Sequence, residues 1–362
     1  MSLDCAGLSN PIALADEFTC YPTAQAPVDW SLHLVHQLDT NTPVAINPKS
    51  HSVTPDGFRM NAKMLTSEWR FDAEPFADAP IAVTASLKEF GRPMDDAYRW
   101  LHRQFTSRAD MLGQIIHEHV LTPRMLLHPD RALLHAASIL RTGADRPICI
   151  GGTGGSGKTS LMLEACCRHG WSFVADDIAV MHVDGRLYPN FSYPKIYGYN
   201  LDAFPELKPQ LHHDSFFGSR LHWFAHRLRG PSKVRRRVDP RQLFNLPARA
   251  ALEAPAHYVI LNRGDGSDFS LRALDRERAA EASIQVLHTE LSTFLAHLRW
   301  SSFNRLLLGA PINDITTRFH EVWRKRLESA LSNTECYQLN FPASATHAEF
   351  LRECWPIIDS LS

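Results

Sequence analysis

The sequence contains no long hydrophobic run, because its uninterrupted apolar segments stay well short of the ~18 residues that a membrane-spanning helix needs. Residues 1–5 also lack the basic region and the hydrophobic segment that open a secretory signal. These absences argue against a membrane partner and against export by that route. We therefore expect a cytoplasmic protein.

Cysteine is scarce and unpatterned, and charge of either sign is not in excess. The seven cysteines are an odd number without a Cys-x-x-Cys pair, which disfavours a disulfide framework and a zinc ribbon. Thirty-eight Lys and Arg residues face thirty-nine Asp and Glu residues, so the chain offers no general attraction for nucleic acid. With 44% hydrophobic and 21% charged residues, the composition is that of a soluble globular protein.

The chain does contain a glycine-rich segment between a short apolar run and a helical one. Residues 152–159 read Gly-x-x-x-x-Gly-Lys-Thr, the motif of a phosphate-binding loop. Glycine permits positive φ angles, so successive N–H groups can turn toward one anion, and the N-terminus of the following helix adds a positive field. The residues predicted to bind ATP here are Gly152, Gly154, Gly155, Ser156, Gly157, Lys158, Thr159 and Ser160.

Within this motif Lys158 is expected to reach the β- and γ-phosphates, and Thr159 to hold Mg²⁺. The chain has no Asn-Lys-x-Asp sequence for reading guanine, which disfavours a GTPase. ATP and Mg²⁺ are therefore the predicted cofactors.

Two consecutive carboxylates, Asp176 and Asp177, follow Lys158 by eighteen and nineteen positions. They close an apolar strand that we expect to lie beside the strand leading into the loop. Neighbouring side chains of a regular strand point to opposite faces, so both can approach one site only at a strand end or a bulge. One could then hold Mg²⁺ while the other accepts a proton. The alternative is one metal-site aspartate and one turn or cap residue, since Asp is a common turn former.

A histidine and a basic run offer further candidates. His135 lies in an apolar strand just before the loop strand, where it is either a structural core residue or a group that hydrogen-bonds an aspartate or the transferring phosphate. In the basic run 233–237, one of Arg235, Arg236 and Arg237 could close over the γ-phosphate or bind an acidic part of the substrate. A solvated surface loop is the alternative for this run, and Arg263 is a weaker candidate of the same kind.

The distribution of periodic segments predicts an α/β protein with two domains, residues 1–122 and residues 123–362. The first domain is expected to be β-rich and to end in a linking helix. Irregular mixing of strands and helices in the second domain favours a mixed sheet over a regular βα alternation. The expected strands cover 30–34, 81–85, 132–140, 171–181, 257–261 and 336–341, with a turn at 55–57 and a hairpin turn at 184–185. The expected helices cover 95–121, 160–169, 275–288 and 312–331, and a further helix follows a capping box at 346–349.

Residues 135–181 resemble the catalytic domain of bacterial HPr kinase/phosphorylase and of HPr-kinase-related proteins. The resemblance rests on paired aspartates at this distance from the loop lysine, combined with an upstream histidine, in the order Leu134-His135, Gly157-Lys158-Thr159 and Phe173-Val174-Ala175-Asp176-Asp177. It implies a mixed-sheet P-loop kinase core akin to phosphoenolpyruvate carboxykinase, with a smaller β-rich N-terminal domain. It also implies that Asp176 is the general base, that Asp177 and Thr159 bind Mg²⁺, and that His135 supports Asp176.

The chain departs from the phosphorylase members at two points. Ser160 stands where those members carry an acidic residue, and the glycine- and asparagine-containing signature of true HPr kinases is missing. The sequence looks more like the related kinases that modify ribosomally made peptides, such as lasso peptides, or that act on free serine. Such kinases are often oligomers, so a homo-oligomer is an expected state.

Three functions follow as hypotheses. The first is an ATP-dependent kinase that phosphorylates a hydroxyl, most readily a serine of a peptide or protein, because the second aspartate supplies the group that orients or deprotonates the acceptor. The second is a small-molecule kinase of the free-serine type. The third is a nucleotide-gated ATPase switch with water as the acceptor. The expected partners are ATP and a hydroxyl-bearing acceptor, with no nucleic acid and no membrane.

Overall fold

The computed structural model of the chain describes residues 2–4, 11–21, 30–35, 45–47, 51–54, 57–64, 67–73, 81–87, 108–211, 223–225, 227–228, 230–309, 312 and 318–361. The chain divides into two compact units. The smaller unit comprises Met1–Thr19, Thr23–Arg103 and Leu291–Phe319, and the larger unit comprises Cys20–Pro22, Gln104–Glu290 and His320–Ser362. The division into two compact units does not test the domain boundary predicted between residues 122 and 123, which stays a prediction.

The smaller unit is built on a seven-stranded sheet of order β1-β2-β7-β6-β5-β4-β3. Its strands are β1 Ser2–Asp4, β2 Trp30–Val35, β3 Ala45–Asn47, β4 His51–Thr54, β5 Gly57–Met64, β6 Ser67–Ala73 and β7 Ile81–Leu87. β1, β2 and β7 run parallel, and β7 to β3 are antiparallel neighbours. The strands predicted over 30–34 and 81–85 are confirmed, whereas the first two residues of the turn at 55–57 lie outside the described part.

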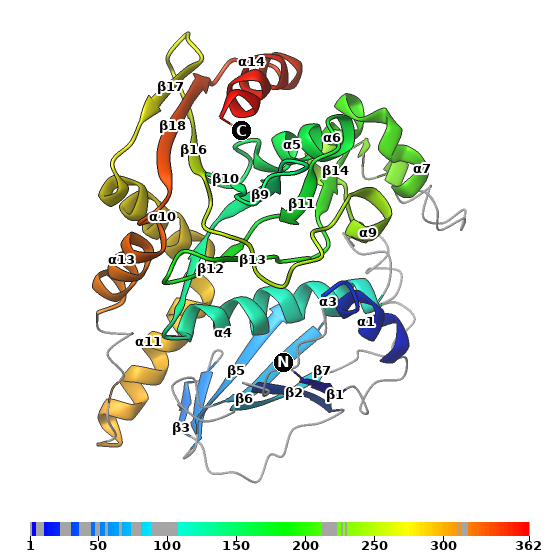
Figure 1. Ribbon diagram of the computed structural model, residues 1–362. Helices are drawn as coiled ribbons and strands as arrows, with labels where there is room; N and C mark the ends of the chain where they lie inside the picture. Colours follow the sequence, from blue (N-terminus) through cyan, green and yellow to red (C-terminus); the bar gives the residue numbers. More distant parts are fainter. Residues whose placement is uncertain are drawn as a thin grey trace. The chain divides into compact units, whose positions relative to one another are not determined.

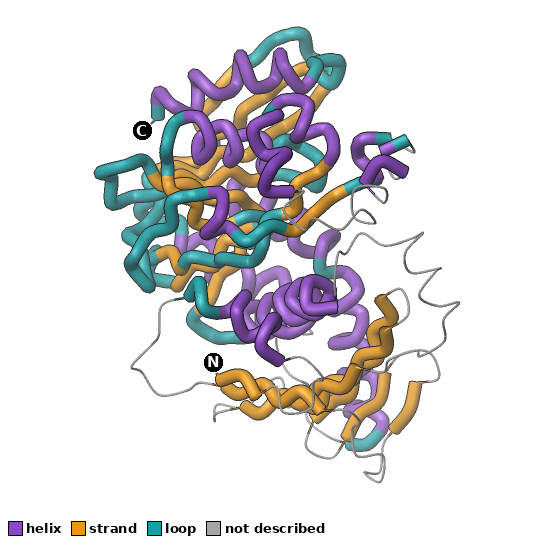
Figure 2. Tube along the Cα trace, turned by 90° about the vertical axis from the view of Figure 1, so that its right-hand side faces the viewer, coloured by secondary structure: helices purple, strands orange, loops and turns teal. Residues whose placement is uncertain are grey.

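The described residues of this unit include the helices α1 Pro11–Phe18 and α11 Ser292–Leu307. The sequence analysis did not predict α11. Its buried side chains include Phe294, Leu295 and Leu298, at the i, i+1, i+4 spacing of an amphipathic helix. Strands (orange in Figure 2) make up most of the described part of this unit.

The larger unit is built on a six-stranded sheet of order β11-β9-β10-β16-β18-β17. These strands are β9 Ala136–Leu140, β10 Ile148–Gly151, β11 Ser172–Ala175, β16 His257–Gly264, β17 Ser270–Ala273 and β18 Glu335–Pro342. β10, β16 and β18 run parallel, while β9 is antiparallel to β10 and β11, and β17 is antiparallel to β18. The predicted α/β fold with a mixed sheet is therefore confirmed.

Two small sheets accompany the large one: β13-β12-β8 and β14-β15. Their strands are β8 Arg131–Leu134, β12 Ala179–His182, β13 Leu187–Tyr188, β14 Lys195–Tyr197 and β15 Arg235–Arg237. The hairpin predicted at residues 184–185 joins β12 to β13 and is confirmed.

The helices of the larger unit surround this sheet in Figure 1. They are α3 Arg108–Ile116, the π-helix η1 His117–Leu121, α4 Thr122–Leu127, α5 Lys158–Leu163, the π-helix η2 Glu164–Arg168, α6 Gly198–Ala203, η3 Pro205–Leu207, α7 Lys208–Leu211, η4 Pro231–Lys233, α9 Pro240–Leu243, α10 Arg276–Glu290, α13 Phe319–Ala330 and α14 His347–Ser360. The helix predicted over 95–121 is confirmed from residue 108, and its earlier part lies outside the described residues. The helix predicted to begin at residue 312 begins at Phe319, and residues 313–317 also lie outside.

Each of two predicted long strands is split between two sheets. Residues 132–140 form β8 and β9 with His135 between them, and residues 172–181 form β11 and β12 with Asp176 to Ile178 between them. β8 pairs with β12 and β9 pairs with β11, so the two chain segments change sheet at the same level. This crossing places the histidine and the aspartate pair close together.

The expectation that the aspartate strand lies beside the loop strand is wrong. β9 lies between β11 and β10 and bonds to both. The reason is that β9 turns back directly into β10 as an antiparallel neighbour, which occupies the edge of β10 that the aspartate strand would need.

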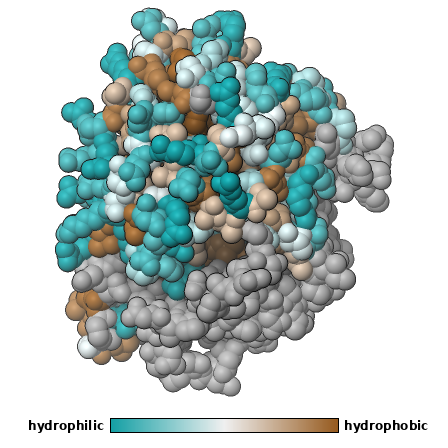
Figure 3. Space-filling view, in the orientation of Figure 1, coloured by the Kyte–Doolittle hydropathy of each residue, from teal (hydrophilic) through white to brown (hydrophobic). Residues whose placement is uncertain are grey.

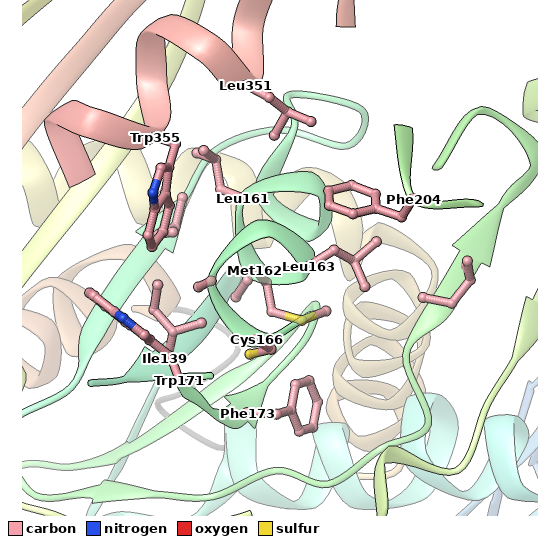
Figure 4. Packing of buried hydrophobic residues seen from close by; sticks show 14 of the residues in the cluster. Ile139, Leu161, Met162, Leu163, Cys166, Trp171, Phe173, Phe204, Leu351 and Trp355 are labelled. Atoms are coloured by element: carbon pink, nitrogen blue, oxygen red, sulfur yellow. The ribbon is translucent and has the colours of Figure 1, made fainter. Parts of the chain in front are cut away.

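One face of the large sheet packs on α5, η2 and α14. Leu161, Met162 and Leu163 are fully buried, and each contributes about 1.5–3 kcal/mol of burial free energy. Figure 4 shows Leu163 beside Phe204, and Leu161 on the side of the helix that faces Leu351. The glycine-rich connection before α5 is thereby held on a rigid support.

The opposite face of the sheet packs on α10. The hydroxyl of Tyr258 on β16 lies 2.9 Å from Ser283 Oγ of that helix. Tyr258 and Ser283 are both buried, so the hydroxyl pair satisfies two polar groups inside the core. Helices therefore cover both faces of the sheet.

Hydrophilic residues cover much of the described surface in the view of Figure 3, with hydrophobic residues between them. Among the described residues, no helix combines the length and the apolar character that crossing a membrane requires.

Candidate functional site

A glycine-rich loop, residues 152–157, joins the end of β10 to the start of α5. The predicted strand, loop and helix are all present in this order. Three of its glycines have φ angles that other residues rarely adopt: Gly152 at 140°, Gly155 at 76° and Gly157 at 105°. The loop therefore has the backbone conformation that glycine makes possible.

Close neighbours also demand glycine at two of these positions. A Cβ atom on Gly157 would lie 2.5 Å from Cζ of Phe350 in α14, and one on Gly152 would lie 2.8 Å from Ser156 Oγ. The first contact involves a buried aromatic ring that has little room to move. Because Gly157 has no side chain, the loop can lie directly against Phe350 of α14.

The side chain of Lys158 curls back over the glycine-rich loop. Its Nζ donates to the carbonyl oxygens of Gly152 at 2.9 Å and Thr153 at 2.8 Å. Burial lowers the pKa of Lys158, against the attraction of Asp177, Asp176 and Glu290. The ammonium therefore lies within the loop, where an anion bound by the loop would meet it.

Asp176 is linked directly to the first turn of α5. The hydroxyl of Thr159 in α5 donates to Asp176 Oδ1, directly after β11, at 2.9 Å, although β9 separates β11 from the loop strand β10. Asp176 is 3% exposed. Burial and the negative charge of Asp177 raise its pKa to about 7, although the hydrogen bond from Thr159 opposes the shift. A carboxyl with this pKa can accept and release a proton near neutral pH.

Asp177 lies in the turn between β11 and β12. It has a φ of 66° and is the one non-glycine residue with a positive φ among those that the structure describes. Asp tolerates this conformation better than most residues. The turn, closed by a bond from Ile178 N to Asp176 O at 2.9 Å, allows two adjacent carboxylates to approach one site.

An ion pair stabilises the negative charge of Asp177. Lys195 Nζ on β14 lies 2.6 Å from Asp177 Oδ2. The Asp177 side chain is 41% exposed, and its partial desolvation by itself would raise its pKa. The Lys195 ammonium outweighs this effect and lowers the pKa of Asp177 well below its ordinary value. Asp177 is therefore ionised wherever the protein is folded near neutral pH, while Asp176 is poised to titrate.

Lys195 and its second partner, Glu118 of η1, were missed by the sequence analysis. Lys195 Nζ lies 2.7 Å from Glu118 Oε1, and Gln114 Nε2 donates to the same oxygen at 2.8 Å. Neither residue belongs to a motif, and Glu118 is 59 positions from Asp177 in the sequence. Only the pairing of β14 and the folding of η1 bring them to the site.

His135 lies at the break between β8 and β9 and is 7% exposed. Its Nδ1 lies 3.8 Å from Glu290 Oε1, which is longer than a hydrogen bond. Burial and the positive charge of Lys158 lower its pKa to about 4, so the imidazole is neutral at pH 7. Among the described residues no hydrogen bond joins His135 to Asp176, and its predicted support of Asp176 stays a prediction.

Ser160 is buried with its hydroxyl turned toward α6 and α14. His347 Nε2 lies 2.8 Å from Ser160 Oγ, and Asn200 Nδ2 donates to the same oxygen at 3.2 Å. This side chain ties three helices together. The predicted contact of Ser160 with ATP would therefore fall to its backbone.

The three arginines lie on strand β15, and the loop-like context predicted for them is wrong. Antiparallel pairing with β14 holds this segment extended. Arg237 Nη1 lies 3.0 Å from Asp110 Oδ1, and the Arg236 guanidinium lies 5.1 Å from the ring centre of Trp223. Both are buried, so the alternative of a solvated surface loop is also wrong.

Arg235 is the least firmly bonded of the three. It donates to Gln114 Oε1 at 3.4 Å and to Tyr197 OH at 3.5 Å, and its buried Nε has no hydrogen-bond partner among the residues that the structure describes. Arg263, the weaker candidate, donates from Nε to the Ala343 carbonyl at 3.1 Å. Of these arginines, Arg235 has the guanidinium best able to take an anionic ligand.

The hydroxyl of Thr159 and the two carboxylates form a set of hard oxygen donors that suits Mg²⁺. Within the described part of the chain, no group of three or more His, Cys, Asp and Glu side chains could hold a metal ion by itself. Mg²⁺ commonly completes its shell with water and nucleotide phosphates. The donor set therefore fits a metal ion that arrives with a nucleotide.

Comparison with known proteins identified no family: no family model matches this chain, and no curated protein matches it.

Proposed function

We propose that this protein is an ATP-dependent kinase that transfers the γ-phosphate to a hydroxyl group, most readily the serine of a peptide or protein. The observation that carries the proposal is the hydrogen bond from Thr159 to Asp176, 2.9 Å long, which joins the glycine-rich loop to the aspartate pair. A loop that binds phosphate and a carboxylate that accepts a proton are the two parts that phosphate transfer to a hydroxyl requires.

These residues bind phosphate, bind metal or accept a proton according to their charges. The loop N–H groups and Lys158 bind the phosphates of ATP, while Thr159 and the permanently charged Asp177 would hold Mg²⁺, which neutralises charge on the β- and γ-phosphates when bound. Asp176, with its pKa of about 7, takes the proton of the acceptor hydroxyl. The acceptor oxygen then bonds to the γ-phosphorus as the bond to the β–γ bridging oxygen breaks, and ADP leaves.

Two further residues adjoin this chemistry. His135 is neutral and buried at the level of the aspartate pair, where it can donate or accept a hydrogen bond without adding charge. The hydrogen bonds of Arg235 to Tyr197 and Gln114 are long, at 3.5 and 3.4 Å, so its guanidinium could exchange them for the transferred phosphate or an acidic group of the acceptor. The location in the cytoplasm, the homo-oligomer and the likeness to HPr-kinase-related proteins belong to the same proposal.

The test is a phosphate-transfer assay by mass spectrometry. Mg-ATP is offered with free serine and with a panel of serine-containing peptides. Asp176→Asn should lower kcat by at least about 100-fold, because general-base catalysis supplies that order of rate. Asp184→Asn, which changes an exposed hairpin carboxylate, is the matched control and should leave the rate unchanged.

Each outcome separates the candidates. A phosphorylated peptide identifies a peptide kinase, and phosphoserine alone identifies the small-molecule kinase. Release of ADP without any phosphorylated acceptor would overturn the proposal in favour of an ATPase switch. Equal rates for wild type and Asp176→Asn would overturn the role of Asp176.

A further inference from the structure

The ammonium of Lys195 lies between two carboxylates from different elements. Its Nζ is 2.6 Å from Asp177 Oδ2 in the turn after β11, and 2.7 Å from Glu118 Oε1 in η1. Both distances are those of charge-assisted hydrogen bonds. Because the side chain of Lys195 is only 18% exposed, water competes little for these bonds.

The strand geometry of β14 explains why Lys195 points this way. Successive side chains of a strand alternate between its two faces. Ile196 is fully buried in the hydrophobic core, so Lys195 and Tyr197 project from the other face. Pairing of β14 with β15 fixes this orientation, since Ile196 is opposite Arg236 in the register.

Glu118 is itself held in place. Gln114, one helical turn earlier, donates to Glu118 Oε1 at 2.8 Å and accepts from Arg235 at 3.4 Å. The charged groups that face Lys195 are thus Asp177, Glu118 and Arg235. Because two of these groups are anions and only Arg235 is a second cation, the net attraction holds the Lys195 ammonium between the two carboxylates.

Asp177 needs such a support. Its positive φ of 66° is a conformation that costs a non-glycine residue of order 1 kcal/mol. The side chain is 41% exposed, so it is not fixed by packing alone. An ammonium anchored at its other side by Glu118 can fix it.

We propose that Lys195 is a positioning residue of the phosphate-transfer site, which, braced by Glu118, holds the Asp177 carboxylate in place beside the glycine-rich loop. The inference rests on the proposed kinase function and adds to it the pair of contacts that joins Glu118 of η1 through Lys195 of β14 to Asp177. It predicts that the charge of Lys195 and its two ion pairs matter to turnover more than to ATP binding.

The kinetic test compares Lys195→Met with Lys195→Arg. Lys195→Met should lower kcat by at least about 50-fold, because the Asp177 carboxylate loses its fixed position. It should change the KM for ATP by less than about 3-fold, because the loop N–H groups and Lys158 still bind the phosphates. Lys195→Arg keeps the charge and two donors, so it should recover at least about 10-fold of that loss. Glu118→Gln should lower kcat by about 5-fold, because it weakens the contact between residue 118 and Lys195 and leaves the Lys195–Asp177 ion pair in place.

The matched control is Lys325→Met, which breaks an exposed pair with Glu321 at 3.0 Å on α13. It should leave kcat unchanged. An active wild type whose kcat survives Lys195→Met would overturn this inference and leave the kinase function intact. A wild type that transfers phosphate to no acceptor would overturn the kinase function and this inference with it.

A second readout does not depend on catalysis. Acetylation of lysines with acetic anhydride, followed by mass spectrometry, should modify Lys195 at least about 10-fold more slowly than the exposed Lys325, because the two ion pairs and burial shield its Nζ. Glu118→Gln should speed the acetylation of Lys195 and leave that of Lys325 unchanged. Equal reactivity of the two lysines in the folded wild type would show that the two ion pairs do not form.

Discussion

At the scale of single residues, the aspartate pair carries two opposite electrostatic states. Asp176 is fully enclosed and titrates near pH 7, while Asp177 is ionised and bonded to Lys195. Desolvation acts on both carboxyl groups, and only Asp177 has an adjacent ammonium that outweighs it. Two environments thus separate the two adjacent carboxylates into a proton acceptor and a fixed anion.

The raised pKa of Asp176 predicts a pH-dependent stability. Because its folded pKa of about 7 exceeds the ordinary value of 3.8, the folded state binds a proton more tightly than the unfolded state does. Its contribution to stability is therefore complete below pH 3.8 and is lost as the pH rises through 7. Asp176→Asn does not titrate, so it should be more stable than wild type at pH 8, by at most about 4 kcal/mol, and the difference should shrink at pH 5.

Urea unfolding of the metal-free protein at pH 5 and pH 8 measures this difference. Asn can still accept the hydrogen bond from Thr159, which keeps the comparison close to the loss of charge alone. The same free-energy difference at both pH values would contradict the account of Asp176.

The residues near the site differ in how well the sequence predicts them. The glycine-rich loop, Lys158 and the aspartate pair are local patterns, so a motif identifies them. Lys195 and Glu118 carry no local pattern, because they reach Asp177 through strand pairing and helix packing over long sequence separations. Such contacts are properties of the fold and have no signature in a single sequence.

At the scale of elements, the connection from β10 to α5 depends on Gly157. Alanine there would adopt a φ of 105° and place its Cβ 2.5 Å from the Phe350 ring. Gly157→Ala should therefore lower the free energy of unfolding by about 2–4 kcal/mol, from backbone strain and overpacking together. It should also weaken ATP binding, because the loop must shift.

The control for this prediction is Gly266→Ala, where a Cβ meets nothing within 4 Å and φ is not positive. It should change the free energy of unfolding by less than about 1 kcal/mol. Urea unfolding of the two variants decides the matter. Equal stabilities would show that α14 does not constrain the loop in the way described.

Strand breaks were the least predictable feature of the elements. His135 and the aspartate pair interrupt the apolar runs 132–140 and 171–181, but a polar residue within an apolar run does not show that the strand continues in a different sheet. The breaks arise because each run pairs with two different sheets. The surface-loop alternative for the basic run failed for a related reason, since a run of charges predicts a surface and gives no sign that Trp223 and Asp110 bury Arg236 and Arg237.

At the scale of the whole molecule, the large mixed sheet and its covering helices could be predicted, and the assignment of segments to units could not. The mixture of strands and helices indicated an α/β fold, which the structure confirms. Leu291–Phe319 groups with the N-terminal segments, although it follows α10 of the larger unit in sequence. This grouping depends on contacts between distant segments, which periodicity cannot indicate.

Nucleotide binding should be visible as a stability gain of the larger unit. A ligand that binds only the folded state adds about 2.7 kcal/mol at a hundred times its Kd, which corresponds to a Tm shift of several degrees. Mg-ATP should therefore raise the Tm in a concentration-dependent manner, and Lys158→Met should reduce the shift by removing a charge that contacts the phosphates. Scanning calorimetry measures both, and an equal shift in wild type and variant would contradict the role of Lys158.

A paired time course of ADP and phosphorylated hydroxyl, taken from one reaction with Mg-ATP and the serine acceptor panel, distinguishes phosphate transfer from hydrolysis. For a kinase, ADP and phosphoserine should appear together in a ratio of about one, as transfer without hydrolysis requires. ADP that accumulates while every acceptor hydroxyl stays unmodified would contradict the kinase function.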